Sequence, residues 1–342
     1  MSSNKIRNMA EFAEISGLSR PTVSKYFIDP GSVRKSTRLK IEQALRKYDY
    51  RPNLFAVNLN KKTSNIIGVI VPDTTDAFYS NLVRHIELNS AANGYLVVVL
   101  CSRGDPQMEA RSIDTLLSLK VTGAIVAPLG TKSEAGLLQN LSDRIPIVYL
   151  DNRLDNTSPY VGTNNFQSMG LITDYLCRTG ARPTYLQMPP VNHNTFERQT
   201  AYVQTMERLG LQPEVITLGS TRSWRFEDIG YTETMKLLAG PGFPTNTVLC
   251  ANDRLAIGVM AAACQSGLKI GRDPDCDLRV AGHDDLPGSR YTCPPLTTVA
   301  QDVERLGSYA VDILLGRVDD DAEDGFETQV QLEGKLMMRS SA

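Results

Sequence analysis

Apolar residues recur with a helical period near the start of the chain. Residues 8–16, 19–28 and 36–48 each place apolar side chains three and four positions apart, which predicts three short amphipathic helices. Gly17 falls between the first two segments, where it can end a helix in a tight turn. Two short helices separated by such a turn predict a helix-turn-helix unit.

After residue 65, short apolar runs alternate with longer amphipathic segments. The runs predict strands at 66–71, 96–101, 123–127, 147–150, 184–188, 214–218, 247–251 and 278–281, and the amphipathic segments predict helices at 78–92, 106–119, 133–141, 166–179, 196–209, 227–239 and 253–266. Strands that alternate with helices form parallel sheets covered on both faces. The pattern predicts an α/β body of two doubly wound lobes. Ligands of such folds bind at the carboxyl ends of the strands, here in the cleft between the lobes.

Charge divides the chain at the same place as the hydrophobic pattern. Residues 1–62 carry thirteen Lys and Arg against five Asp and Glu, a net charge of +8. The other 280 residues carry 23 basic and 33 acidic side chains, a net charge of −10. A short basic head on a long acidic body predicts a module that binds a polyanion. With the helix-turn-helix pattern, this indicates double-stranded DNA, with the second helix in the major groove.

Several other classes of protein are disfavoured by the sequence. No apolar run approaches the ~20 residues of a membrane span, and the N-terminus lacks the apolar core of a signal peptide. We therefore expect a cytoplasmic protein without a membrane partner. Common catalytic and nucleotide-binding motifs are absent, as is metal-ligand spacing among the histidines and cysteines. We expect no catalytic residues, metal or cofactor, so an enzyme is disfavoured. A periplasmic transport protein is disfavoured as well, because it would need a signal peptide.

The residues of the head resemble the opening of the lactose-repressor (LacI/GalR) family of bacterial transcription regulators. The resemblance is carried by residues 9–62, MAEFAEISGLSRPTVSKYFIDPGSVRKSTRLKIEQALRKYDYRPNLFAVNLNKK. It continues through DNR at 151–153, CANDRLAIG at 250–258 and PLTTVAQ at 295–301, and so covers essentially the whole chain.

The resemblance implies three parts for the chain. They are a helix-turn-helix DNA-binding domain at 1–48, a hinge helix or linker at 49–62, and a two-lobed effector-binding and dimerisation domain at 63–342. The domain resembles periplasmic sugar-binding proteins, with an N-lobe of about 63–163 plus 299–326 and a C-lobe of about 164–298 plus 327–342. The resemblance also implies a homodimer, associated with the bacterial nucleoid.

The resemblance places the DNA contacts on the second helix and the hinge. Arg20, Pro21 and Lys25 match the positions that face bases, and Arg20 can bind a guanine edge through two hydrogen bonds. Ser19, Thr22 and Ser24 match phosphate contacts, although local backbone hydrogen bonds remain an alternative for Thr22 and Ser24. In the hinge, the implied contacts are Asn53, Ala56 and Leu59. Leu59 is expected to wedge into the minor groove, unless 49–62 is only a flexible linker.

The resemblance also implies an effector site in the cleft. The candidates are polar or aromatic residues at strand ends and helix starts: Asp73, Phe78, Asp151, Arg153, Arg198, Trp224, Asn252, Asp284 and Gln301. Carboxylates and amides can make paired hydrogen bonds to vicinal hydroxyls, and aromatic rings can cover the apolar face of a sugar. Asp76 is a second choice, while Asp253 and Asp285 are expected to cap helices or turns. A salt bridge between the lobes, without ligand, remains the alternative for Arg198 and Asp284.

These expectations together predict a repressor whose operator affinity is controlled by a small-molecule effector. The candidate carboxylates favour a neutral sugar or sugar derivative. A sugar acid or phosphate becomes the alternative if two or more of Arg153, Arg198, Arg222 and Arg225 converge. The alternative functions are a non-allosteric DNA-binding protein and a cytosolic sugar-binding protein.

Overall fold

The computed structural model describes residues 6–48, 50–51, 64–218, 223–318 and 327–342. The chain separates into two compact units. The first contains the residues up to Asn65 together with Lys120–Thr122, and the second contains the rest of the chain. Ser64 links the segment Lys120–Thr122 to the first unit: its hydroxyl donates to the backbone oxygen of Lys120 at 2.6 Å.

The head is a three-helix domain of α1 (Met9–Ser16), α2 (Arg20–Ile28) and α3 (Lys35–Tyr48), with a 3-10 turn η1 (Pro30–Ser32) after α2. The helix ends agree with the sequence prediction to within one residue. The Asn8 side chain accepts from the Glu11 amide at the start of α1, and Gly17 ends that helix with a φ of 65°. Phe12, Val23 and Ile41 bring one buried side chain from each helix into a small core.

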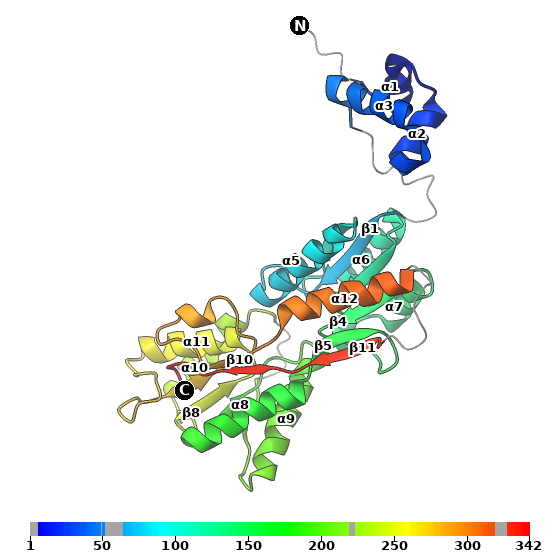
Figure 1. The fold of residues 1–342 in the computed structure, drawn as a ribbon. Coiled ribbons are helices and arrows are strands. Elements are labelled where there is room, and N and C mark those ends of the chain that lie inside the picture. The colour runs from blue at the N-terminus through cyan, green and yellow to red at the C-terminus, as the bar shows by residue number, and fades with distance from the viewer. Residues whose placement is uncertain (1–5, 49, 52–63, 219–222, 319–326) are drawn as a thin grey trace. The chain divides into compact units, whose positions relative to one another are not determined.

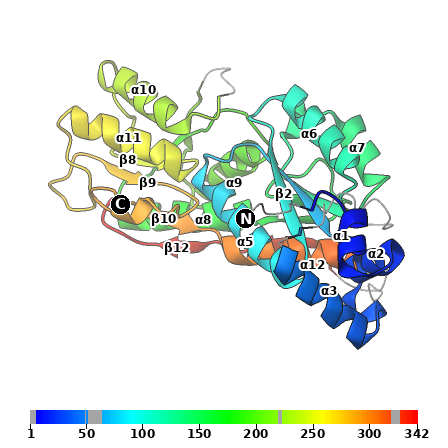
Figure 2. The same ribbon diagram turned by 90° about the horizontal axis from the view of Figure 1, so that it is seen from above.

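The N-lobe is built on a parallel sheet of six strands in the order β11-β5-β4-β3-β1-β2. Its strands are β1 (Ile66–Val71), β2 (Leu96–Cys101), β3 (Gly123–Val126), β4 (Ile147–Leu150), β5 (Tyr160–Thr163) and β11 (Gln329–Leu332). Helices α5 (Ala77–Ala92) and α12 (Val303–Val318) pack together on the sheet, while α6 (Pro106–Leu119) and α7 (Ala135–Ser142) form another pair (Figure 2). A 3-10 turn η2 (Gly130–Lys132) precedes α7.

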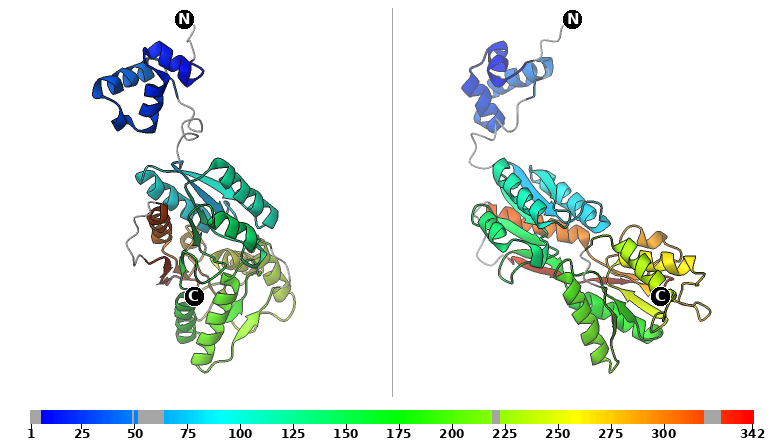
Figure 3. Two further views of the ribbon diagram at one scale, coloured as in Figure 1. Left: turned by 90° about the vertical axis from the view of Figure 1, so that its right-hand side faces the viewer. Right: turned by 180° about the vertical axis from the view of Figure 1, so that it is seen from behind.

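The C-lobe is built on a second parallel sheet, in the order β7-β6-β8-β9. Its strands are β6 (Thr184–Leu186), β7 (Glu214–Ile216), β8 (Thr247–Cys250) and β9 (Arg279–Ala281). Two helix pairs pack with it: α8 (Asn165–Thr179) with α9 (Asn194–Arg208), and α10 (Phe226–Leu238) with α11 (Asp253–Gln265). A 3-10 turn η3 (Ser289–Tyr291) follows β9. The two sheets form the separate lobes seen from two sides in Figure 3.

Three chain crossings join the lobes, after β5, after β10 (Thr298–Ala300) and after β11 (Figure 1). The third leads into β12 (Lys335–Met337), which pairs antiparallel with β10. This corrects the expected boundary, which placed all of 327–342 in the C-lobe. Gln329–Leu332 lies in the N-lobe sheet because it pairs in parallel with Tyr160–Thr163.

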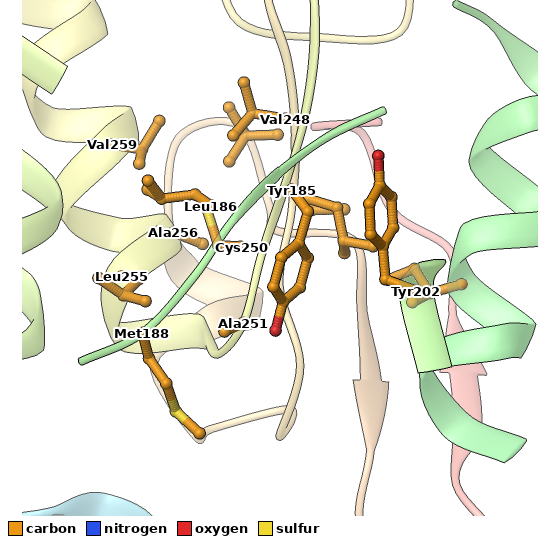
Figure 4. Packing of buried hydrophobic residues seen from close by; sticks show 14 of the residues in the cluster. Tyr185, Leu186, Met188, Tyr202, Val248, Cys250, Ala251, Leu255, Ala256 and Val259 are labelled. Carbon is orange, nitrogen blue, oxygen red and sulfur yellow. The ribbon is translucent and has the colours of Figure 1, made fainter. Parts of the chain in front are cut away.

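The core of the C-lobe positions the loops that reach the cleft. The rings of Tyr185 on β6 and Tyr202 on α9 stack at 5.0 Å, and aliphatic side chains of β8 and α11 fill the space beside them (Figure 4). The Tyr202 hydroxyl donates to the backbone oxygen of Pro183 at 2.7 Å. These contacts hold α9 against β6, the strand whose carboxyl end leads to the candidate site.

Candidate functional site

A cavity lies between the two lobes at the carboxyl ends of the strands. Its volume is about 40 Å³, and the space around it, counted with the part open to solvent, is about 360 Å³. Seven of the nine predicted effector residues line it: Phe78, Asp151, Arg198, Trp224, Asn252, Asp284 and Gln301. Asp76, the second choice, lines it as well.

The two other predicted effector residues are engaged outside the cavity. The Asp73 carboxylate accepts from the amide and the hydroxyl of Thr75, both at 2.8 Å, and so closes a local turn. The guanidinium of Arg153 lies 4.8 Å from the ring centre of Tyr160. Neither side chain is among those that line the cavity.

Arg198 occupies one wall of the cavity and is held by three protein partners. Its Nη2 lies 3.1 Å from Asp284 Oδ1, its Nε donates to Asn165 Oδ1 at 3.0 Å, and its Nη1 donates to the backbone oxygen of Ala251 at 2.8 Å. Its side chain is 5% exposed. All three nitrogens of the guanidinium therefore have partners within the C-lobe. The expected alternative, a salt bridge between the lobes, is wrong in its placement, because Arg198 and Asp284 pair inside the C-lobe.

Asp284 is the centre of a buried polar network. Its Oδ1 accepts from Gln301 Nε2 at 2.7 Å and lies 3.0 Å from His283 Nδ1. Burial would raise the pKa of Asp284, but the Arg198 charge and these hydrogen bonds hold it below its usual value. Burial and the Arg198 charge lower the pKa of His283 to about 4, so its ring is neutral near pH 7. The carboxylate is thus ionised and the imidazole is not.

Asp151 faces the cavity from the end of β4. Its Oδ2 accepts from the Tyr79 hydroxyl at 2.7 Å, and its Oδ1 accepts from Asn194 Nδ2 at 3.0 Å. Since Asn194 begins α9, the second bond joins the N-lobe to the C-lobe. Burial raises the pKa of Asp151 to about 6. Asp151 and Asp284 have φ values of 63° and 126°, so both site carboxylates stand on backbone that L-residues rarely adopt.

Aromatic rings cover the apolar side of the cavity. Trp224 lies 6.2 Å from Tyr79 and 5.7 Å from Phe226, measured between ring centres, and Phe78 lies 5.3 Å from Tyr79. Tyr79 and Phe78 belong to the N-lobe, while Trp224 and Phe226 belong to the C-lobe. Trp224 packs against the cores of both lobes. The arrangement can hold a flat apolar face between rings.

Sequence reasoning missed several residues of this wall: Tyr79, Met188, Val191, Asn192, Asn194 and Phe226. Asn192 is notable because its Oδ1 is buried without a hydrogen-bond partner in the structure. A buried acceptor without a partner is costly, which suggests a ligand donor at this point. The clustering of Asn192 and Asn194 directly before a predicted helix is the signal that could have found them.

Asp253 and Asp285 both have structural roles, but Asp285 forms an ion pair in place of the expected cap. Asp253 accepts from the Leu286 amide at 2.9 Å and from the hydroxyls of Ser289 and Thr298. Asp285 pairs with Arg339 at 2.6 Å. Both carboxylates tie loops of the C-lobe to one another and do not line the cavity.

The predicted base-contacting residues of the head share the exposed side of α2. Arg20, Pro21 and Lys25 are exposed, and Arg20 and Pro21 form the first turn of the helix. Ser19 caps this helix: its hydroxyl accepts from the Thr22 amide at 3.4 Å and lies 2.8 Å from the Thr22 hydroxyl. Ser19 and Thr22 thus have a local structural role, and phosphate contact by either stays a prediction.

The predicted hinge contacts Asn53, Ala56 and Leu59 lie outside the described residues. Among the residues that the structure does describe, no group of three or more His, Cys, Asp or Glu side chains is placed to hold a metal ion. None of the described helices is both long and apolar enough to cross a membrane.

Comparison with known families assigns both units. Residues 8–53 match the family described as bacterial regulatory proteins, lacI family, and residues 173–342 match a periplasmic binding protein-like domain. The chain joins a lacI-family DNA-binding head to a periplasmic binding protein-like domain. It is therefore a DNA-binding transcription regulator, which confirms the predicted family, fold class and general function.

Relatives and solved structures match this chain over nearly its whole length. The ribose operon repressor of Escherichia coli (strain K12) is 28% identical over 98% of this chain and 99% of its own length. The HTH-type transcriptional repressor PurR of Haemophilus influenzae (strain PittEE) is 27% identical over 97% of each chain. The lac repressor dimer bound to operator and the anti-inducer ONPF gives a TM-score of 0.84 at 26% identity, with 98% of this chain and 99% of that chain covered. The curated relatives named here are repressors and not enzymes.

Proposed function

We propose that this regulator is a homodimeric repressor whose affinity for operator DNA changes when a neutral sugar binds between its lobes. The observation that carries the effector class is the state of Arg198. Its three nitrogens already have protein partners, one of them the carboxylate of Asp284. A sugar acid or phosphate binds best to a cation whose charge is unpaired, whereas the charge of Arg198 is already paired with Asp284.

The acceptors of the cavity support the same ligand class. Asp76, Asp151 and Asp284 line the cavity with Arg198, and Asn192 adds an acceptor without a partner. A ligand with several hydroxyl donors and no negative charge suits such a wall. Arg153 and Arg225 do not line the cavity, and Arg222 lies outside the described residues. The condition for an anionic effector, two converging arginines, thus finds no support in the described residues.

The DNA-binding part of the proposal rests on the head. Arg20 and Lys25 project from the exposed side of α2, on a folded domain that belongs to the most basic part of the chain. We assign base contacts to Arg20, Pro21 and Lys25, phosphate contacts to Ser19, Thr22 and Ser24, and minor-groove contacts to Asn53, Ala56 and Leu59. As a DNA-binding regulator of a bacterial family it works in the cytoplasm, and we assign it to the nucleoid.

The exposed edge of the N-lobe sheet supports the proposal of a homodimer. β2 is the last strand of that sheet, so one side of its backbone has no neighbouring strand. Leu96 at its start and Leu88 on α5 are both 57% exposed. Apolar side chains beside an open strand edge are typical of a surface that another chain covers, and the lac repressor to which this fold is similar is described as a dimer.

A combined binding experiment tests the proposal. Full-length protein is screened by thermal shift against D-ribose and other neutral sugars, sugar acids, sugar phosphates and nucleobases, and every hit is then tested for its effect on operator retention. We expect a neutral sugar to raise the melting temperature and to change retention. A hit confined to acids or phosphates would contradict the assignment of Arg198, and retention that no ligand changes would favour a non-allosteric DNA-binding protein.

A further inference from the structure

Arg254 reaches from the C-lobe to the N-lobe beside the cavity. Its Nη1 lies 2.9 Å from Oδ2 of Asp76, which lines the cavity and caps the first turn of α5. The side chains of Arg254 and Asp76 are 11% and 7% exposed. Arg254 itself does not line the cavity. The contact is therefore a shielded ion pair that crosses the cleft, and solvent and salt screen it less than a surface pair.

The C-lobe holds Arg254 rigidly before it meets Asp76. Nε and Nη2 of Arg254 each donate to one oxygen of Glu227 at 2.7 Å, which gives a bidentate ion pair, here called the fork. The guanidinium also lies 5.1 Å from the ring centre of Phe226. With Nη1 on Asp76, each nitrogen of the group has a carboxylate partner.

Two glycines bring the helices that carry this fork together. A Cβ at Gly258 on α11 would lie 2.2 Å from the backbone oxygen of Glu227, and one at Gly230 on α10 would lie 2.4 Å from that of Leu255. Only glycine allows α10 and α11 to approach this closely. Backbone contact thus fixes the positions of Glu227 and Arg254 relative to each other. The contact that can open is the one between Arg254 and Asp76.

We propose that Arg254 is a cross-cleft positioning residue, which binds Asp76 to hold the lobes closed and to aim the Asp76 carboxylate into the effector cavity. The proposal deepens the proposed function, since it gives regulation to the same cavity. A ligand that contacts Asp76 meets a carboxylate that Arg254 already holds, so closure and binding favour each other. Without Arg254 the closed state is less populated, and the apparent affinity for an effector falls by the same fraction.

Trp224 provides a direct readout of closure. It is the only tryptophan of the chain, and it packs against the cores of both lobes. Opening of the cleft must expose its ring to solvent. Its emission maximum and its quenching by acrylamide can be measured in full-length protein with neither effector nor DNA present.

The test compares Arg254→Met, Asp76→Asn and the double variant with the wild type. Arg339→Met is the matched control, because Arg339 pairs with Asp285 at 2.6 Å with similar exposure, 14% and 10%, but inside the C-lobe. We expect each single cleft variant to shift Trp224 emission to the red and to raise its quenching constant at least about twofold. The double variant should match the single ones, because both break one link, and Arg339→Met should match the wild type.

Two results would overturn the proposal. One is unchanged Trp224 quenching in Arg254→Met and Asp76→Asn, and the other is a double variant whose effect is the sum of the two. Circular dichroism and cooperative urea unfolding show that each variant is folded, and Glu227→Gln replaces Arg254→Met if the latter fails to fold. Because no ligand is used, a negative effector screen would overturn the proposed function while leaving this result intact.

Discussion

Arg198 and Asp284 face each other at 3.1 Å inside the C-lobe, and each is held by further partners that do not touch the other. Asn165 and Ala251 hold the guanidinium, and Gln301 and His283 hold the carboxylate. Gln301 lies on the crossing after β10, so the pair links the wall of the cavity to a connection between the lobes. The network makes this wall rigid before any ligand arrives.

Removal of Arg198 should therefore destabilise the protein strongly. Arg198→Met leaves Asp284 buried without its cation, and the expected loss is about 3–5 kcal/mol in the free energy of unfolding. Urea unfolding at pH 7 measures it. Arg208→Met is the control on the same helix, since Arg208 is 63% exposed and lies 3.9 Å from Asp174, and its loss should be about 0–1 kcal/mol. Equal losses in the two variants would contradict the buried network.

The raised pKa of Asp151 should make the free energy of unfolding depend on pH. Burial raises its folded pKa to about 6, above the usual 3.8 of an aspartate, so its protonated form is favoured in the native state. Its contribution is fully present below about pH 4 and is lost as the pH rises through about 6. The shift corresponds to about 2–3 kcal/mol.

Comparison with Asp151→Asn isolates this contribution, because Asn does not titrate. The wild type should lose about 2–3 kcal/mol relative to the variant between pH 4 and pH 7, measured by urea unfolding. Asp253, with a pKa raised to about 7 by burial, and His283 titrate in both proteins and cancel in the difference. A difference that does not change with pH would show that Asp151 keeps an ordinary pKa.

Much of the fold could be predicted because local signals agree with the tertiary structure. Asn8, Ser19 and Gly17 mark helix ends by chemistry that acts within a few residues, and these ends were placed to within one residue. Strand β11 could not be found this way. Its four residues alternate polar and apolar at the sheet edge, and their partner strand β5 is more than 160 residues away.

The candidate site shows the same division between local and distant information. Asp151, Asn252 and Asp284 follow strands within one to three residues, and the carboxyl ends of parallel strands meet at one edge, so their place was predictable. Asn192 lies in an irregular loop, where the path of the chain decides which side chain faces the cavity. The link from Arg254 to Asp76 depends on how far the lobes close, which no local pattern encodes.

Arg20 should read one base pair in each half of the operator. Arg20→Ala should relax sequence preference at that position and cost about 1–3 kcal/mol of binding there, measured with operator variants in parallel. Arg46→Ala, which removes the same charge from the end of α3, is the control and should leave sequence preference unchanged. Wild-type preference in Arg20→Ala would show that Arg20 contacts only the backbone of DNA.

Leu59 should act only on operator DNA, because we expect it to enter the minor groove there. Leu59→Ala is expected to weaken operator binding much more than binding to non-specific DNA, because the lost wedge no longer stabilises the bent site. Titration of both DNAs at one salt concentration measures the ratio. Val57→Ala is the control from the same segment. Equal losses on the two DNAs would contradict a wedge.

Gly104 lies against Trp224, and the contact leaves no room for a side chain. A Cβ at Gly104 would come within 2.5 Å of the indole ring, and the φ of 70° is itself unfavourable for other residues. Gly104→Ala should therefore displace Trp224, shift its emission to the red and raise its quenching by acrylamide. Gly94→Ala separates the two causes, because Gly94 has a φ of 78° with open space around its Cβ position. Both variants should lose about 1–2 kcal/mol to backbone strain, but only Gly104→Ala should alter Trp224. The same emission spectrum in both variants would show that Trp224 does not rest on Gly104 in solution.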